Sequence, residues 1–448
     1  MPQTPKKIAI AGAGLVGSLL AVLLAQKGHQ VKIYERRPDM RKLDIGGGRS
    51  INLALSDRGW RALEKAGVAD EVKKNAIPMY GRMIHNEDGT QTFQAYGKEN
   101  QAIYSVSRGG LNMILMDFAE KNGVKIIFDK RIEKVDLDQA IMHFEDQSSV
   151  DADILFGADG AFSSVRLSMQ MTDRFEYSQH YLEHGYKELS IPPGKKEKWQ
   201  LEKNALHIWP RKSFMLIALP NIDGSFTCTL FAPFEGENSF ADLTTPEQVE
   251  EYFHVHFKDA LPLMATLTED FFNNPTSSLV TVKCHPWVYK DQVALIGDAA
   301  HAIVPFYGQG MNAGFEDCTI LENILKVHGD DWAAIFHEYQ RERKENGDAI
   351  ADLAVLNFIE MRDLVADPDF LLRKKVEKRL MGKIPHDYLP LYSIVTFSDL
   401  PYKYALKEVQ LQNDFFRLAF SRGLIHENIS EEDLNKLSEI WLKQYKLK

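Results

Sequence analysis

Residues 7–17 read KIAIAGAGLVG, a short apolar strand that runs directly into a turn with glycine at positions 12, 14 and 17. A helical pattern follows over residues 18–27 and ends at Gly28, the residue type expected just past a helix C-terminus. A second apolar strand, 31–34, then ends at Glu35. This order of strand, glycine turn, helix, strand and acid predicts a dinucleotide-binding βαβ unit. The alternative is a glycine-rich turn in another kind of α/β protein.

Each residue of this unit has a physical task. Gly12 allows the tight turn, Gly14 lets a pyrophosphate approach the backbone, and Gly17 lets the helix pack against the strand. Glu35 can accept hydrogen bonds from both hydroxyls of an adenosine ribose, and its charge disfavours a 2′-phosphate. The turn therefore indicates NAD or FAD and does not distinguish between them.

Two later turns carry the same kind of chemistry. Residues 151–160 form an apolar strand that ends in Gly-Ala-Asp-Gly, and a helix is predicted from about Ser163. Residues 295–317 contain a buried strand, then Gly297 and Asp298, a bend rich in glycine and proline, and the start of an amphipathic helix. Such bends leave backbone N–H groups free to bind anions. Taken singly, each is also compatible with an ordinary turn and helix cap.

The composition is that of an ordinary globular protein and excludes several classes of function. Of 448 residues, 44% are hydrophobic and 26% charged, and the net charge of -10 without a basic block argues against nucleic acid as a partner. No apolar stretch is long enough for a transmembrane anchor. The three cysteines are far apart in the sequence, which favours reduced thiols in a cytoplasmic protein over disulfides or a metal site.

The period of the apolar pattern changes along the chain and predicts an α/β protein with an inserted domain. From 175 to 288 apolar and polar residues alternate, which indicates a largely antiparallel sheet, with the strands near 80–105 as candidates to join it. Residues 1–174 and 289–330 flank this insertion as two parts of one Rossmann-like domain. The remaining region, 331–448, is predicted to be helical. Helices are expected at 318–326, 332–361, 368–381 and 402–418, and a terminal amphipathic helix at 425–448.

The three glycine turns, in this order, resemble those of the single-component FAD-dependent aromatic hydroxylases. In that family the first turn binds the FAD pyrophosphate, the second supports both FAD binding and the reaction with NADPH, and the third places an aspartate, here Asp298, on the ribityl or pyrophosphate region. The resemblance makes 1–174 and 289–330 an FAD-binding domain and 175–288 a substrate domain. It implies cofactor contacts at Gly12, Gly14, Leu15, Val16, Gly17, Glu35, Arg36, Arg108, Asp159, Asp298, Gly308, Gly310, Met311 and Asn312.

Further blocks of sequence narrow the resemblance to the members of this family that hydroxylate L-kynurenine. They extend from the first strand to about residue 405 and so cover nearly all of the chain. The blocks are RSINLAL at 49–55, GRM at 81–83, HGYKEL at 184–189, NALHIWP at 204–210, PF at 305–306, GQGMN at 308–312, YS at 392–393 and TFS at 396–398.

By this resemblance the substrate carboxylate is held by Arg82, Tyr96 and Tyr392, with Asn357 nearby. The aromatic ring is expected to lie against Leu206, Met215, Ile217, Phe231, Pro305, Phe306 and Met361. Pro305, Phe306, Gln309 and Gly310 are expected to face the reacting atoms. Tyr307 departs from the pattern, because relatives have His or Phe at this position, and no proton-transfer role is assigned to it.

The residue types agree with these roles and also allow plainer ones. A guanidinium is a natural bidentate partner for a carboxylate, and tyrosine hydroxyls complete its hydrogen bonds. An arginine in a strand is also commonly exposed or ion-paired, and tyrosines are commonly core residues. Asn357 lies among apolar neighbours in a predicted helix, so its amide needs a partner, for which a ligand is one candidate. His301 is expected to stabilise its turn and not to act as a base.

The resemblance implies an enzyme of the kynurenine pathway, in tryptophan catabolism and NAD biosynthesis. FAD would be reduced by NADPH and would react with O₂ to give a C4a-hydroperoxide, whose distal oxygen adds to the ring of L-kynurenine and gives 3-hydroxy-L-kynurenine. The substrate's own amino group activates the ring, so no protein base is required. The protein is expected to be a monomer or homodimer. The alternatives are another FAD-dependent aromatic hydroxylase and a non-catalytic binding protein on the same fold, such as the escort proteins that bind prenylated small GTPases.

Overall fold

The nucleotide-binding half of the molecule is built on a six-stranded sheet. The computed structural model describes residues 4–42, 52–97, 100–195, 199–361 and 367–445. All neighbouring strands of this sheet are parallel except the pair β18–β19, and β19 returns to the sheet after the long insertion. The strand order is β18 (Val288–Tyr289), β19 (Val293–Leu295), β12 (Ile154–Gly157), β1 (Lys7–Ala11), β2 (Gln30–Tyr34) and β8 (Lys125–Ile127).

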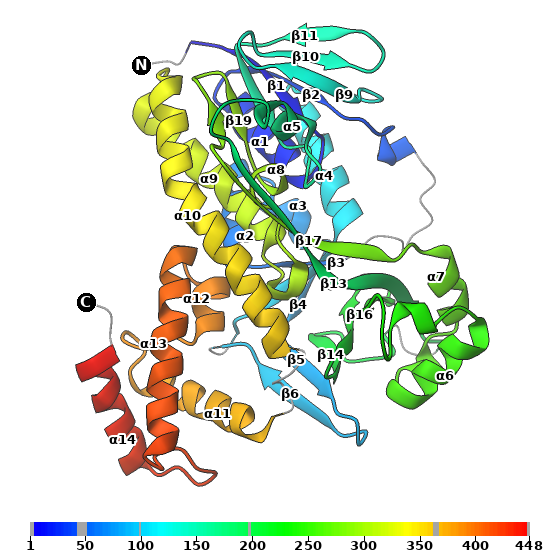
Figure 1. The fold of residues 1–448 in the computed structure, drawn as a ribbon, viewed down its shortest axis with the longest axis vertical. Coiled ribbons are helices and arrows are strands. Elements are labelled where there is room, and N and C mark those ends of the chain that lie inside the picture. The colour runs from blue at the N-terminus through cyan, green and yellow to red at the C-terminus, as the bar shows by residue number, and fades with distance from the viewer. Residues whose placement is uncertain (1–3, 43–51, 98–99, 196–198, 362–366, 446–448) are drawn as a thin grey trace.

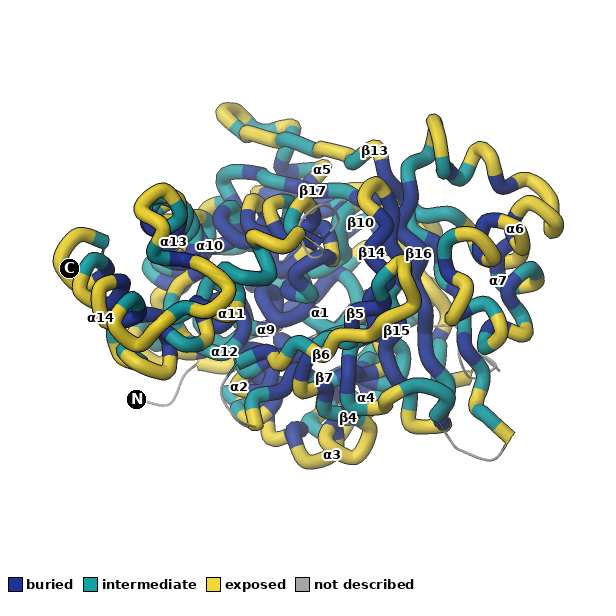
Figure 2. Tube along the Cα trace, turned by 90° about the horizontal axis from the view of Figure 1, so that it is seen from below, coloured by how far each residue is buried: buried dark blue, intermediate teal, exposed yellow. Residues whose placement is uncertain are grey.

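Helix α1 (Leu15–Gln26) begins earlier than the predicted 18–27, directly after Gly14 at the N-cap, because the glycine turn itself provides the first helical residues. The other helices of this half are α2 (Asp57–Ala66), α3 (Ala69–Lys73), α4 (Arg108–Lys121), α5 (Ser164–Met169), α8 (Asp298–His301) and α9 (Gly310–His328). Helix α9 also begins before the predicted 318–326. Figure 2 shows α1 and α9 as largely buried central helices.

Two small antiparallel sheets complete this half. One contains β9 (Ile132–Asp136), β10 (Ile141–Phe144) and β11 (Ser149–Asp151), and lies at the top of Figure 1. The other has the order β3 (Asn52–Leu55), β7 (Ile103–Ser107) and β4 (Ala76–Met79).

The inserted region forms a seven-stranded sheet that is antiparallel except for the pair β5–β14. Strands β5 and β6 lie in this sheet, whereas β7 does not. Its order is β17 (Ser277–His285), β13 (Glu176–Ile191), β16 (Phe226–Pro233), β15 (Phe214–Pro220), β14 (Ala205–Arg211), β5 (Gly81–His85) and β6 (Gln91–Ala95). Helices α6 (Pro246–His256) and α7 (Leu267–Asn273) cover one face. The predicted fold class is confirmed, and we propose the division at 174, 288 and 330 as the domain boundaries.

The C-terminal region is helical and lies at the lower left of Figure 1. The long α10 (Trp332–Ile359) runs from the nucleotide-binding half towards β5 and β14. It is followed by α11 (Pro368–Lys383), α12 (Leu391–Phe397), α13 (Tyr402–Ser421) and α14 (Glu431–Ile440). The predicted terminal helix is present as α14 and a π-helical turn, Trp441–Tyr445, but it begins at Glu431 and not at 425, because a capping box at Ser430 starts it. Helix α12 was not predicted.

Within the described ranges, the helices all fall short of the length or the apolar character that crossing a bilayer requires. One hydrophobic cluster joins the inserted sheet to α10, α12 and α13. It includes Met215, Phe231, Phe306 and Met361. This cluster forms the wall of the cavity described next.

Candidate active site

A cavity of about 390 Å³ lies between the nucleotide-binding half, the inserted sheet and the C-terminal helices. It brings together seventeen of the predicted site residues. Those predicted to bind the cofactor are Gly14, Leu15, Val16, Arg108, Asp298, Gly308, Gly310 and Met311, and those predicted to contact the substrate are Arg82, Leu206, Met215, Ile217, Phe231, Pro305, Phe306, Met361 and Tyr392. We call these two groups the cofactor end and the substrate end. The remaining predicted residues are not among those that line the cavity: Gly12, Gly17, Glu35, Arg36, Tyr96, Asp159, Gln309, Asn312 and Asn357. The first part of the block 49–55, residues 49–51, falls outside the described residues.

The glycine turn has the shape that a bound pyrophosphate requires. A Cβ atom added to Gly14 would meet no heavy atom within 4 Å, whereas at Gly17 it would lie 2.1 Å from the Gly12 carbonyl oxygen. At Gly12, which has a φ of 98°, it would lie 2.7 Å from the Ala158 oxygen. Gly12 and Gly17 are thus required by packing, while the space at Gly14 opens onto the cavity at the N-terminus of α1. The residues present fit a dinucleotide cofactor.

Glu35 closes the turn from the end of β2. Its Oε2 accepts a hydrogen bond from the Ala13 N–H at 2.8 Å, and its Oε1 accepts one from the Arg37 N–H at 3.0 Å. A carboxylate can accept further hydrogen bonds at each oxygen. Arg36 beside it is exposed. Glu35 therefore holds the glycine turn directly and keeps capacity for ribose hydroxyls.

Asp298 lies where the third turn meets the cavity. Gly297 before it has a φ of 63°, and its N–H donates to Asp317 Oδ2 at 3.1 Å. His301 Nε2 donates to the same oxygen at 2.6 Å, so this histidine stabilises the turn. Burial raises the pKa of Asp298. Asp159 in the second turn accepts a hydrogen bond from Ser164 N at 2.7 Å, and its Oδ1 is buried without a partner.

The loop 305–309 and the first turn of α9 line one side of the cavity. Gly308 has a φ of 66°, and the Asn312 side chain donates to its carbonyl at 2.8 Å and accepts from Ser56 N at 3.0 Å. Ser56 is the N-cap residue of α2, but its hydroxyl makes no capping bond. Gln309 accepts from the Tyr402 hydroxyl at 3.1 Å. Asn312 and Gln309 therefore fix this loop with their side chains, while Gly308 and Gly310 face the cavity.

At the opposite end three tyrosine rings form a stack beside Arg82. Tyr96 and Tyr392 are 5.1 Å apart at 11°, and Tyr392 and Tyr307 are 5.7 Å apart at 14°. The Arg82 guanidinium carbon lies 4.8 Å from the Tyr392 ring and 5.6 Å from the Tyr96 ring. Arg82 Nε is buried without a hydrogen-bond partner in the described part of the chain, whereas the Tyr96 hydroxyl lies within hydrogen-bonding reach of Arg82 and Tyr392. An unpaired buried N–H of this kind is costly unless a ligand completes it.

Asn357 supports the substrate end from α10. Its amide donates to the Phe306 carbonyl at 2.7 Å, and so the partner that this buried side chain requires is the backbone of the loop. The Phe306 ring lies 4.2 Å from Phe358 and 5.0 Å from Phe231. Asn357 thus positions an aromatic wall of the cavity.

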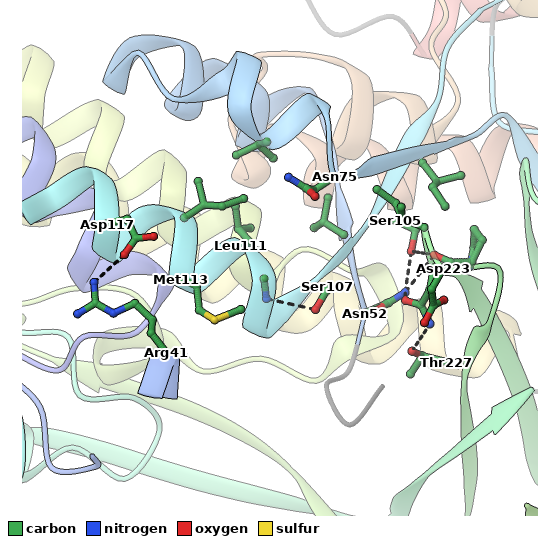
Figure 3. A pocket seen from close by; sticks show the side chains of 18 residues that line it. Arg41, Asn52, Asn75, Ser105, Ser107, Leu111, Met113, Asp117, Asp223 and Thr227 are labelled. Atoms are coloured by element: carbon green, nitrogen blue, oxygen red, sulfur yellow. Dashed lines mark hydrogen bonds and ion pairs between the residues drawn. The ribbon is translucent and has the colours of Figure 1, made fainter. Parts of the chain in front are cut away.

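A second cavity, of about 660 Å³, is shown in Figure 3 and shares Asn52 and Thr227 with the first. Its lining combines apolar side chains with amides and hydroxyls. Arg41 at one end forms ion pairs with Asp39 at 2.8 Å, Asp117 at 2.7 Å and Glu120 at 2.6 Å. Three carboxylates therefore neutralise the Arg41 guanidinium, which leaves it less available to a ligand carboxylate than Arg82 is in the first cavity.

Several lining residues of the first cavity were missed. Thr227 and Thr229 precede the predicted Phe231 on β16 at spacings of two, and Leu219 follows Met215 and Ile217 on β15. Residues two apart in a strand share a face, so the alternation would have identified them. Nothing local in the sequence marks Ser278 to Val280 on β17, which the sheet order brings to the cavity.

Replacing Tyr307 tests the role of the ring stack. Burial raises the pKa of Tyr307 well above its usual value, so its hydroxyl stays protonated at neutral pH. We expect Tyr307→Phe to change the KM for the substrate by less than about twofold, because the stacked ring remains. Tyr307→Ala should raise it by about tenfold or more through loss of packing against Tyr392. Steady-state kinetics of both variants measure this, and equal effects would assign the role to the hydroxyl.

The strand that carries Arg82 is backed by a buried chain of hydrogen bonds. His85 Nδ1 contacts Asp259 Oδ2 at 2.6 Å, and its Nε2 contacts His207 Nδ1 at 2.9 Å. His207 Nε2 donates to the Glu202 carbonyl at 2.8 Å. Burial lowers the pKa of His207 to about 4, so this imidazole is neutral in the folded protein near pH 7.

We expect the lowered pKa of His207 to make the folded protein less stable in mild acid than at neutral pH. The unfolded imidazole titrates near pH 6.5 and the folded one near 4, so the unfolded chain binds more protons between these values. This contribution to stability is complete above about pH 6.5 and declines as the pH falls towards about 4. In His207→Gln, the free energy of unfolding in urea should vary less between about pH 5 and 7 than in the wild type. An equal pH slope would contradict this assignment.

A family model described as FAD binding domain matches residues 6–354. Among solved structures, 2-methyl-3-hydroxypyridine-5-carboxylic acid oxygenase resembles this chain with a TM-score of 0.69 and 21% identity, over 84% of this chain and 98% of that one. The fold is that of the FAD-dependent monooxygenases.

Relatives at high identity define the family more narrowly. The protein named kynurenine 3-monooxygenase from Flavobacterium johnsoniae is 52% identical over 98% of this chain and 100% of its own length. The one from Dictyostelium discoideum is 50% identical over 98% of each chain. The chain belongs to the kynurenine 3-monooxygenase family, whose members are FAD-dependent enzymes, and the resemblance found in the sequence is confirmed.

Proposed function

We propose that this protein hydroxylates L-kynurenine to 3-hydroxy-L-kynurenine with NADPH and O₂. The names of the relatives support the substrate, and the cavity supports the chemistry, because it runs from an open glycine turn to an arginine beside tyrosines. When bound, FAD would supply the redox chemistry by accepting a hydride from NADPH and activating O₂ for transfer of one oxygen atom. The oxygen-transfer route is the one that the sequence resemblance implies.

The observation that carries this proposal is the buried Arg82 Nε at the substrate end, which has no hydrogen-bond partner among the described residues. Arg82 lines the cavity together with Tyr392. A substrate carboxylate in the cavity would accept from the Arg82 guanidinium, with the Tyr392 ring beside it. An amino-acid carboxylate therefore suits this end.

The other residues position the ring and exclude water. Leu206, Met215, Ile217 and Phe231 form an apolar wall from three adjacent strands, and Pro305 and Phe306 also line the cavity, with the Phe306 ring against Phe231. The N–H groups of residues 308–312 at the N-terminus of α9 suit the stabilisation of negative charge on a flavin. The protein's contribution on this account is placement, since the amino group of the substrate activates the ring.

We further propose that the reaction takes place in the cytoplasm, in a monomer or homodimer. The three cysteines, Cys228, Cys284 and Cys318, are buried free thiols, which suits a reducing compartment.

Two measurements on the purified protein test the proposed function. The purified protein should show the absorbance of bound flavin. Its rate of NADPH oxidation should be higher with L-kynurenine than with a simple phenolic acid. A protein that stays colourless after incubation with FAD would contradict the enzyme and favour a binding protein on this fold. Equal stimulation by L-kynurenine and by the phenolic acid would favour another aromatic hydroxylase.

A further inference from the structure

Arg58, on α2, is a fully buried arginine outside the cavity, with 1% of its surface exposed. Its Nε donates to the Val395 carbonyl at 3.0 Å, and its Nη2 donates to the carbonyls of Ile394, at 3.5 Å, and Leu400. These carbonyls belong to the last turn of α12 and the segment after it, where a helix leaves its carbonyls without intrahelical partners. A cation at this end also favours the helix dipole. Arg58 thus fixes α12, whose first turn carries Tyr392.

From Arg58 a series of buried ion pairs continues towards the cofactor end. Arg58 Nη1 donates to Glu316 Oε1, and Arg343 Nη1 donates to Glu316 Oε2 at 2.7 Å. Arg343 Nε donates to Asp317 Oδ1 at 2.6 Å, and Asp317 Oδ2 accepts from the N–H of Gly297 at 3.1 Å. We call Arg58, Glu316, Arg343 and Asp317 the buried ion chain.

The charges of the buried ion chain balance. Two guanidinium groups face two carboxylates. Burial alone would raise the pKa values of Glu316 and Asp317. Arg343 and Arg58 lower the pKa of Glu316, and His301 and Arg343 lower that of Asp317, so both carboxylates stay ionised at neutral pH. Removing one member leaves an uncompensated buried charge. The two ends of the chain are therefore held in one arrangement relative to each other.

A second contact joins the same elements. The Arg58 guanidinium lies 4.0 Å from the Tyr402 ring on α13, and the Tyr402 hydroxyl donates a hydrogen bond to Gln309 in the loop 305–309 at 3.1 Å. Arg58 therefore contacts groups that lead both to Tyr392 and to the loop around Gly308.

Resting on the proposed function, we propose that Arg58 is a positioning residue for both ligands. Through its bonds to the end of α12 it sets Tyr392 against the substrate, and through the buried ion chain it sets the Gly297 turn, with Asp298, against FAD. The geometry is specific to arginine, because one planar group donates to three backbone carbonyls and a carboxylate. Lysine keeps the charge and loses this fork. Loss of Arg58 is thus expected to weaken the binding of two ligands, L-kynurenine and FAD, that Arg58 does not contact.

The chain offers a matched control on the same two helices. Glu322 on α9 is 5% exposed and forms ion pairs with Lys27 and with Lys65 of α2, both at 2.8 Å. It links α2 to α9 as Glu316 does, but its partners do not reach α12 or the Gly297 turn. Glu322→Gln therefore removes a comparable buried charge without breaking the proposed link.

The test measures ligand binding and thermal stability. Titration calorimetry with L-kynurenine on the FAD-loaded protein, and FAD titration of the apoprotein, should give dissociation constants raised by about fivefold or more in both Arg58→Lys and Glu316→Gln. Glu322→Gln should lower the melting temperature while both constants stay within about twofold of the wild type. A double-mutant cycle tests whether Arg58 acts through Tyr392. If it does, Arg58→Lys should weaken L-kynurenine binding by a smaller factor in the Tyr392→Phe variant than in the wild type.

Unchanged dissociation constants in Glu316→Gln and in a folded Arg58→Lys would overturn the inference, as would additive effects with Tyr392→Phe. If Arg58→Lys does not fold, Glu316→Gln alone decides. L-Kynurenine binding by the wild type is measured first. If the wild type does not bind L-kynurenine, both the proposed function and this inference are contradicted. If the wild type binds L-kynurenine and the variants bind it equally well, only the inference is contradicted.

Discussion

Replacing Arg82 with alanine is expected to raise the KM for L-kynurenine by roughly 30-fold or more, since truncating one partner of a buried charged pair costs about 2–5 kcal/mol. Arg82 lines the substrate end of the cavity, and its Nε has no partner in the protein. The bound FAD should be unaffected, because the glycine turn is at the other end. Steady-state kinetics and the flavin absorbance of the purified variant measure the two effects.

Arg82→Lys is the control for this variant. It keeps the positive charge and loses the planar fork, so its KM should lie between those of the wild type and Arg82→Ala. Loss of flavin from either variant would instead assign Arg82 to cofactor binding or to folding.

The second large effect is expected at Gly14. A side chain there meets open space in the protein and would occupy the position of the FAD pyrophosphate. The backbone of Gly14, with φ -72° and ψ -179°, is extended and accepts any residue. We therefore expect Gly14→Val to fold, with apoprotein stability within about 1 kcal/mol of the wild type, and to retain less than about a tenth of the FAD. Flavin content and urea unfolding of the apoprotein measure both quantities.

Gly17→Val introduces the same side chain three residues later. Its Cβ would lie 2.1 Å from the Gly12 carbonyl oxygen, so this variant should fail to fold with or without FAD. Two variants that lose FAD and stability to the same degree would show that the space at Gly14 is structural and is not reserved for a cofactor.

The sequence predicted the parts of the site that rest on local patterns. The glycine turn, with Glu35 at the end of β2, follows from the order of a few adjacent elements. Strand β15 follows from the period of two, whereas the place of Met215 and Ile217 in the site came from the resemblance. Resemblance supplied what periodicity could not, namely that Arg82 and Tyr392, 310 residues apart, line one cavity.

Other features depend on contacts between distant segments. Helix α12 has seven residues and a β-branched, aromatic sequence, so its helical form depends on packing and on Arg58 at its end. The stacking of Tyr307 on Tyr392 depends on how the loop at 305 meets this helix. Asn357 was expected to need a partner, and the partner is the Phe306 carbonyl. The buried ion chain could not be predicted, because each arginine taken alone has the features of a surface residue.

The central claim is that the cavity places the ring of L-kynurenine where one atom of O₂ is added to it. The most direct test is a reaction of the FAD-loaded protein with NADPH, L-kynurenine and ¹⁸O₂, followed by mass spectrometry of the product. We expect 3-hydroxy-L-kynurenine that carries one ¹⁸O atom. NADPH oxidation that yields only hydrogen peroxide, or a product hydroxylated at another position, would contradict the claim.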